Sequence, residues 1–254
     1  MEAKNMFSLE GKRALITGAS KGIGQAIAVA FAQQGAKVAI SGRMTSLEDT
    51  ERMVKEHSKD CISIPLDIRD AKQRENAVKQ MVEAFGGIDI LVNNAGGNRA
   101  APGLEVTEEN WDYIFDVNLK GGFFLTQLVA PYMIKAGWGR IIFISSQSGL
   151  VAIPGQLGYC TSKGAVLSEA RTLGVEWAKH GVTVNSIAPT FVKTSLTEKR
   201  LEDPAFLNYV LGMIPCGKLA DVKDIACAAV FLASEEAKMV NCHTLCVDGG
   251  WTAW

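Results

Sequence analysis

The sequence has no long apolar segment, no excess of charge of one sign and no signal-peptide pattern at its first residues. Its apolar runs are shorter than the ~20 residues that cross a bilayer, and residues 1–7 lack the apolar core of a signal peptide. Its 26 basic and 27 acidic residues give a formal net charge of -1. We therefore expect a cytoplasmic protein with no membrane partner, and the charge gives no electrostatic basis for binding nucleic acid.

Cysteine is present but not in a pattern that indicates a disulfide framework or a metal site. The six cysteines are scattered, none forms C-x-x-C, and a chain of 254 residues does not need disulfides to fold. Cys242, His243 and Cys246 are close in sequence, but in a strand His243 would point away from the two thiols. We therefore predict buried thiols and no metal.

Apolar strand candidates alternate with helical patterns along the chain. Helices are expected to begin near Gly22, Thr45, Asp70, Thr107, Tyr159 and Asp221, and strands at residues 12–17, 36–41, 61–65, 88–93, 139–145, 182–188 and 243–247. Such alternation predicts an α/β fold with a doubly wound parallel sheet of about seven strands and helices on both faces.

The chain contains no repeat and no linker composition, so we expect one domain over residues 1–254. One irregular region lies around 190–215. Pro189 directly precedes it, Pro204 lies within it and Pro215 ends it. Because it follows a strand, it lies where open α/β sheets bind ligands. We favour a lid over the site, and a surface insertion is the alternative.

A glycine-rich turn follows the first strand candidate. Residues 17–24 read TGASKGIG, with an apolar strand pattern before them and a helical apolar face after them. Glycines in this context let backbone amides approach a pyrophosphate at the helix N-terminus, where the helix dipole favours negative charge. The alternative is a glycine turn without a ligand.

Tyr159 and Lys163 stand one helical turn apart, with Ser146 upstream. Residues four apart share a helix face, and a nearby ammonium lowers the pKa of a phenol from its free value of ~10. A hydroxyl such as that of Ser146 holds a substrate oxygen beside the phenol. The three side chains predict proton transfer to or from an alcohol oxygen, although Ser145 and Ser148 are also available in the same polar run.

These motifs, in this order, resemble the short-chain dehydrogenase/reductase family over nearly the whole chain. The resemblance implies a Rossmann-like fold and an oxidoreductase acting on CH-OH groups (class EC 1.1.1.-). It also implies that Tyr159 is the general acid/base, that Ser146 polarises the carbonyl, that Lys163 tunes Tyr159 and that Asn118 holds a relay water. The alternative for Asn118 is a capping role. The residues that match the cofactor site of the family are Gly18, Ser20, Lys21, Gly22, Ile23, Gly24, Arg43, Asp67, Ile68, Asn94, Ala95, Gly96, Tyr159, Lys163, Pro189, Val192 and Thr194.

The second strand ends at Gly42 and Arg43, where NAD-using members of the family carry an acid. A guanidinium suits a 2′-phosphate, and Lys21 resembles a second basic residue of NADP-using members. We therefore predict NADP(H) as the cofactor, with NAD(H) as the less favoured alternative. Thr190 stands where the family usually has Gly, which raises the question of whether the loop needs a left-handed residue.

The substrate is expected to be a small-molecule ketone or secondary alcohol. Arg99 follows the Asn-Ala-Gly motif and would pair with the carboxylate of a sugar acid, or else is a solvated surface charge. The C-terminal residues 247–253 resemble gluconate 5-dehydrogenase-like members, which favours a sugar, sugar acid or polyol. Reductases of 3-oxoacyl thioesters share the same motifs, and the apolar lid residues would suit an acyl chain: Phe191, Leu196, Leu201, Phe206, Leu207 and Tyr209.

Two further expectations concern function class and assembly. A non-catalytic nucleotide-sensing scaffold would have no need for Ser146, Tyr159 and Lys163 together, so catalysis is favoured. The resemblance implies a homotetramer formed through two long helices and the C-terminal strand. The helices around 108–136 and 159–180 are apolar on several faces, which is consistent with burial against a partner subunit. The residues that carry this prediction are Phe123, Phe124, Leu125, Val166, Leu167 and Leu173, with Trp251 and Trp254 at an interface or in the core.

Overall fold

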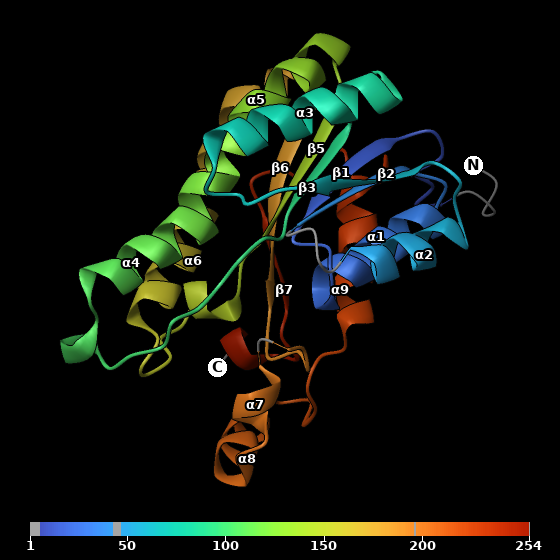
Figure 1. Ribbon diagram of the computed structural model, residues 1–254. Coiled ribbons are helices and arrows are strands. Elements are labelled where there is room, and N and C mark those ends of the chain that lie inside the picture. Colours follow the sequence, from blue (N-terminus) through green and yellow to red (C-terminus); the bar gives the residue numbers. More distant parts are fainter. Residues whose placement is uncertain (1–5, 43–46, 196, 254) are drawn as a thin grey trace.

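The computed structural model describes residues 6–42, 47–195 and 197–253, whose elements are labelled in Figure 1. Within these residues a seven-stranded sheet has the order β3-β2-β1-β4-β5-β6-β7, and every strand pairs in parallel with its neighbours. The strands are β1 (Arg13–Thr17), β2 (Lys37–Gly42), β3 (Cys61–Pro65), β4 (Ile90–Asn93), β5 (Gly139–Ile144), β6 (Val182–Pro189) and β7 (Thr244–Val247). The predicted parallel sheet is confirmed.

Helices cover both faces of the sheet (Figure 1). One face carries α1 (Gly22–Gln33), α2 (Glu48–Lys55) and α9 (Val222–Ala233). The other carries α3 (Ala71–Phe85), α5 (Gly121–Ala136) and α6 (Leu157–Trp177). Successive side chains of β1 show the division, because Ile16 packs in the first core and Leu15 in the second. Strands buried on both faces need the near-continuous apolar runs seen in the sequence.

Side-chain caps fix several helix starts that the sequence predicts. Asp70 accepts hydrogen bonds from the backbone of Lys72 and Gln73, and Thr107 accepts one from Asn110. Asp221 forms a capping box with Asp224. Each cap satisfies backbone donors that the first helical turn leaves unpaired. The expected start at Thr45 lies outside the described residues, and α2 is described from Glu48.

The helix expected around 108–136 is interrupted. It consists of α4 (Glu108–Phe115), a π-helical turn over Asp116–Lys120, and α5. Such turns insert one residue into the hydrogen-bond ladder and are frequent at functional sites. The π-helical turn contains Asn118, whose side chain is buried.

The region after β6 is more ordered than the sequence suggests. It contains α7 (Glu198–Leu201) and α8 (Pro204–Met213), which lie beyond one end of the sheet near the C-terminus (Figure 1). Trp251 is buried there, with its ring centroid 5.8 Å from that of Phe191 and 6.3 Å from that of Tyr209. Trp251 is thus a core residue of this region, whereas Trp254 lies outside the described residues. Among the described helices, none has the length and apolar character of a membrane span.

Candidate active site

The glycine turn after β1 is tied to the segment after β4. The Thr17 hydroxyl accepts hydrogen bonds of 3.0 Å from the backbone amides of both Asn94 and Ala95. The Asn94 side-chain amide donates to the carbonyls of Thr17 and Gly18, at 2.9 Å each. These bonds fix the turn and the Asn-Ala-Gly segment as one unit at the carboxyl ends of two adjacent strands.

Two glycines in the turn are required by close packing. A Cβ at Gly18 would lie 2.9 Å from the Ala95 Cα, and one at Gly24 would lie 2.5 Å from the Asn94 Nδ2. Gly22 begins α1 with φ of +60°, and a Cβ there would lie 3.3 Å from the Thr194 Cγ2. The sequence places the amides of the α1 N-terminus at this turn, an arrangement that binds phosphate.

The other predicted cofactor residues follow the same strand ends. Asp67 and Ile68 come after β3, where Asp67 pairs with Arg69 at 2.6 Å. Pro189 ends β6, and Val192 and Thr194 follow it. Because the strands are parallel, all of these positions lie along one edge of the sheet. Ser20 and Ile23 lie in the turn with Lys21, whose side chain is exposed. Arg43 lies outside the described residues.

Ser146, Tyr159 and Lys163 come together from β5 and α6. Ser146 follows β5, and its Oγ accepts a hydrogen bond of 3.1 Å from the Ser148 backbone amide. Ser146 also hydrogen-bonds Tyr159. The Lys163 ammonium lies 5.7 Å from the centroid of the Tyr159 ring and donates to the Ile144 carbonyl at 2.7 Å. The three predicted side chains therefore form one cluster.

Burial governs the protonation of this cluster. It raises the pKa of Tyr159 to about 12, and the hydrogen bond with Ser146 only partly offsets the effect. It lowers the pKa of Lys163 to about 8. The expected lowering of the Tyr159 pKa by Lys163 is not seen in this structure, where the ammonium donates to the Ile144 carbonyl rather than to the phenol. At neutral pH the phenol is protonated and is therefore a proton donor.

Asn118 contacts the loop beside this cluster. Its Oδ1 accepts from the Gly97 amide at 2.8 Å, and its Nδ2 donates to the Gly97 carbonyl and the Ser162 hydroxyl, both at 3.0 Å. A Cβ built on Gly96 would lie 3.4 Å from the Asn118 Oδ1 and 3.6 Å from the Lys163 Nζ. Asn118 and Lys163 thus border the same small space, and the alternative of a capping role does not describe these contacts.

The Ser146 and Tyr159 side chains line a pocket of about 100 Å³. The other lining residues are Asn98, Gln147, Ser148, Gln156, Thr190, Phe191, Thr197 and Arg200. Sequence reasoning assigned no site role to Gln147 or Arg200. The position of Gln147 next to Ser146 in the sequence could have indicated a role for it. Arg200, in contrast, reaches the pocket only through the fold of the region after β6.

The structure resolves the question raised by Thr190. Its φ is not in the left-handed region, since Phe7 and Cys242 are the non-glycine residues with positive φ in the described part of the chain. The Thr190 backbone amide donates to the Val247 carbonyl at 3.1 Å, which holds the loop against β7. A side chain at position 190 is therefore compatible with the backbone, and it faces the pocket.

Arg99 does not line this pocket. Its guanidinium hydrogen-bonds Glu109 at 3.1 Å and Asn110 at 3.2 Å, and it stacks 4.0 Å from the centroid of the Tyr113 ring. In this structure the guanidinium is thus paired with a carboxylate of the chain itself, and pairing with a substrate carboxylate stays a prediction. The first turns of α4 supply a carboxylate and an aromatic face that hold Arg99 away from the site.

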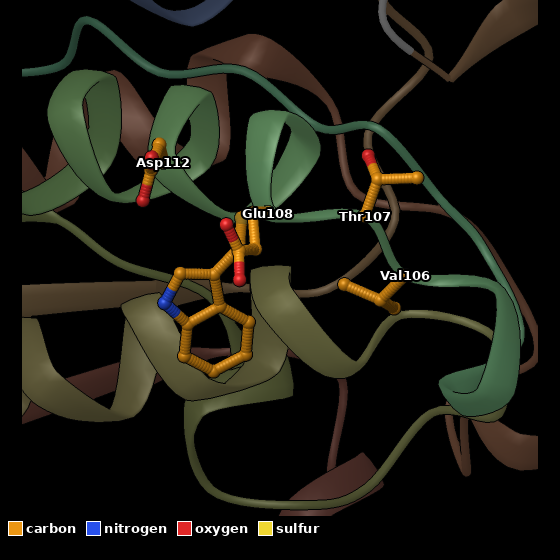
Figure 2. Close-up of a pocket in the computed structure, with 5 residues that line it drawn as sticks. Val106, Thr107, Glu108 and Asp112 are labelled. Carbon is orange, nitrogen blue, oxygen red and sulfur yellow. The ribbon is translucent and has the colours of Figure 1, made fainter.

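A second pocket, of about 340 Å³, lies at the start of α4 (Figure 2). It is lined by Val106, Thr107, Glu108, Trp111 and Asp112, all from one short segment. It is larger than the first pocket, but it contains no member of the Ser146, Tyr159 and Lys163 cluster and its charged groups are two carboxylates. The smaller pocket is therefore the candidate site. No group of three or more potential metal ligands occurs among the described residues.

Known proteins resemble this chain over nearly its whole length. The family model described as enoyl-(acyl carrier protein) reductase matches residues 18–252. D-threitol dehydrogenase of Mycolicibacterium smegmatis is 40% identical, with 97% of this chain and 95% of the relative covered. The 3-oxoacyl-(acyl-carrier-protein) reductase of Thermotoga maritima is also 40% identical, over 95% of this chain and 98% of the relative.

A solved structure extends the comparison. The crystal structure of a gluconate 5-dehydrogenase from Burkholderia cenocepacia, in complex with NADP and tartrate, superposes with a TM-score of 0.93. It is 35% identical and covers 98% of each chain. The sheet, the glycine turn and the Ser-Tyr-Lys cluster define a dinucleotide-dependent oxidoreductase class. Within it, the chain belongs to the short-chain dehydrogenase/reductase family.

Proposed function

We propose that the chain interconverts a ketone and a secondary alcohol with NADP(H), and that its substrate is a sugar, sugar acid or polyol. The observation that carries this proposal is the cluster of Ser146, Tyr159 and Lys163 beside a small pocket at the edge of the sheet that carries the glycine turn. The relatives named for threitol and gluconate support the substrate class.

The chain's own residues fit a dinucleotide at this edge. The glycine turn leaves α1 amides free of side-chain obstruction, and Lys21 offers an exposed cation beside them. Asp67, Ile68, Asn94 and Thr194 surround the remaining strand ends. When bound, NADPH supplies a hydride to the carbonyl carbon. Arg43, from its position after β2, is the residue we assign to the 2′-phosphate.

The proton is supplied by the protein. Ser146 donates a hydrogen bond to the substrate oxygen and holds it beside the Tyr159 hydroxyl. As the carbonyl carbon gains a hydride, Tyr159 gives its proton to the oxygen, and the product is the alcohol. Lys163 stabilises the phenolate that remains. A water in the space bordered by Asn118 and Lys163 then returns a proton from solvent to Tyr159.

Reduction of a 3-oxoacyl thioester is the second candidate, because a relative at 40% identity carries that name. The lid argues against it. Phe191 and Phe206 pack edge to face with centroids 5.6 Å apart, and Tyr209 lies 6.3 Å from Phe206. These three aromatic side chains therefore pack against each other rather than forming a channel for an acyl chain. Of the three, Phe191 lines the pocket.

Tyr159→Phe tests the proposed mechanism. The variant lacks the proton donor, so we expect it to fold and bind NADPH while its turnover falls by roughly 10²- to 10⁴-fold. The measurement is steady-state NADPH oxidation together with NADPH binding by fluorescence. Tyr132→Phe, on an exposed part of α5, is the matched control and should retain activity. Near-normal turnover of Tyr159→Phe would contradict the assigned role.

We also propose that the chain forms a homotetramer through α5 and α6. Four of the six predicted interface residues pack in the chain's own core: Leu125, Val166, Leu167 and Leu173. Phe124 remains 38% exposed and Val175 73%, which leaves apolar surface on both helices. Sedimentation velocity at micromolar concentration should give a species larger than the monomer, and a purely monomeric species would refute the assembly.

A further inference from the structure

The candidate pocket contains buried polar groups that have no partner within the described chain. Gln147 is 1% exposed, and neither its Oε1 nor its Nε2 has a hydrogen-bond partner. Thr190 is 8% exposed, and its hydroxyl is likewise unpartnered. Buried polar atoms normally have a hydrogen-bond partner, and a buried atom without one destabilises the protein. Both side chains line the same pocket as Ser146 and Tyr159, so a ligand that donates and accepts hydrogen bonds would satisfy them.

Arg200 adds a positive charge to this pocket. It lies on α7, with its guanidinium 4.0 Å from the centroid of the Phe206 ring. No ion pair of Arg200 occurs among the residues that the structure describes. Stacking on Phe206 holds the planar guanidinium, while its N–H groups stay available for the bidentate bonds that carboxylates accept. Arg99, in contrast, already has a carboxylate partner in Glu109.

We propose that Gln147 and Thr190 bind hydroxyl groups flanking the reacting carbon, and that Arg200 binds a carboxylate of the same substrate. The inference rests on the proposed function and makes it more specific. The preferred substrate is a small polyhydroxylated keto acid, rather than a neutral keto sugar or an acyl thioester. A site built for hydroxyls rejects an analogue without them, because the polar groups of the site then stay buried and unpaired.

The pocket's size agrees with this assignment. Its volume of about 100 Å³ is below the ~300–1,000 Å³ of pockets that hold drug-sized ligands. Asn98 and Gln156 add two more amide side chains to the lining, and the Asn98 Oδ1 is also without a partner. A lining with several amides, hydroxyls and one cation is matched to a short chain of hydroxyl-bearing carbons that ends in an anion.

The test compares kcat/KM for NADPH-dependent reduction of four probes by the full chain: 5-ketogluconate, fructose, acetoacetyl-coenzyme A and cyclohexanone. Wild type should prefer 5-ketogluconate. Arg200→Met should lower kcat/KM for 5-ketogluconate by roughly 10- to 100-fold, mainly through KM, and should leave fructose almost unchanged. Lys199→Met, which removes the adjacent cation of α7 outside the pocket lining, is the matched control and should behave as wild type.

Gln147→Leu should lower kcat/KM roughly 10-fold for 5-ketogluconate and fructose but not for cyclohexanone, which has no hydroxyl to bind. Circular dichroism and NADPH binding identify variants that fail to fold, and Gln147→Met is the replacement if the leucine variant does. Equal losses on acid and neutral probes for Arg200→Met would overturn the inference, as would a wild-type preference for fructose, and both results leave the proposed function standing. A wild-type preference for the thioester would overturn the inference and also favour the second candidate function. No NADPH oxidation with any ketone would instead refute the proposed function and the inference together.

Discussion

At the scale of single residues, the glycine turn shows how close packing limits which residue type fits at a position. Gly24 lies inside α1 without a left-handed φ, so conformational freedom does not explain it. A Cβ there would lie 2.5 Å from the Asn94 Nδ2 and 2.6 Å from the Gly18 carbonyl. The missing side chain therefore lets Asn94 bind the turn, which in turn positions the amides proposed to hold the pyrophosphate.

Gly24→Ala should destabilise the protein even though alanine is the better helix former. The Cβ meets backbone, which moves only at the expense of the turn, so we expect a loss of roughly 1–3 kcal/mol and weaker NADPH binding. Gly212→Ala, in α8 with nothing within 4 Å of the added Cβ, is the matched control. It should be neutral or stabilising by up to ~1 kcal/mol. Urea unfolding measures both, and an equally stable Gly24→Ala would refute the packing argument.

At the scale of elements, α6 carries more than the catalytic pair. Glu169 lies on the same helix as Tyr159 and Lys163, and both of its carboxylate oxygens are buried without a partner in the described chain. Burial raises the pKa of Glu169 from 4.5 to about 8. The folded protein therefore binds a proton that the unfolded chain has released between these two pH values.

The sign of this linkage predicts a pH dependence of stability. Because the folded-state pKa of Glu169 is raised, binding of its proton contributes to the free energy of unfolding. That contribution is fully present below pH 4.5 and is lost as pH rises toward about 8. Glu169→Gln cannot titrate, so its Tm should fall less than that of wild type between these limits. Glu176→Gln, exposed on the same helix, is the control and should retain the wild-type slope. Equal slopes for wild type and Glu169→Gln, measured by calorimetry, would show that Glu169 does not titrate in this range.

Most strands and several helix starts could be predicted from local sequence patterns. Each predicted strand is found within about two residues, because a buried parallel strand requires an apolar run. Asp70, Thr107 and Asp221 mark helix starts through local hydrogen bonds, which sequence motifs record directly. The π-helical turn around Asn118 has no such local signal. The Asn118 side chain in this turn instead accepts a hydrogen bond from Gly97 and donates one to Ser162, and both residues are distant in sequence.

At the scale of the whole molecule, the site is assembled from segments across the chain. Ser146, Tyr159 and Lys163 were predictable because spacing and side-chain chemistry identify them together. The contacts that Arg99 makes within the chain could not be predicted, because Glu109 and Tyr113 of α4 become neighbours of its guanidinium only in three dimensions. Arg200 was missed for the same reason, since only the packing of the region after β6 brings α7 to the pocket.

The most direct test of the account compares the oxidation of NADPH and of NADH by the purified chain with 5-ketogluconate as substrate. If Tyr159 donates a proton while the cofactor supplies a hydride, NADPH is consumed in step with the ketone and the corresponding alcohol accumulates. We predict this result, with NADPH used in preference to NADH. Binding of NADPH without oxidation, on 5-ketogluconate and on neutral and thioester ketones alike, would contradict the account and favour a nucleotide-sensing scaffold.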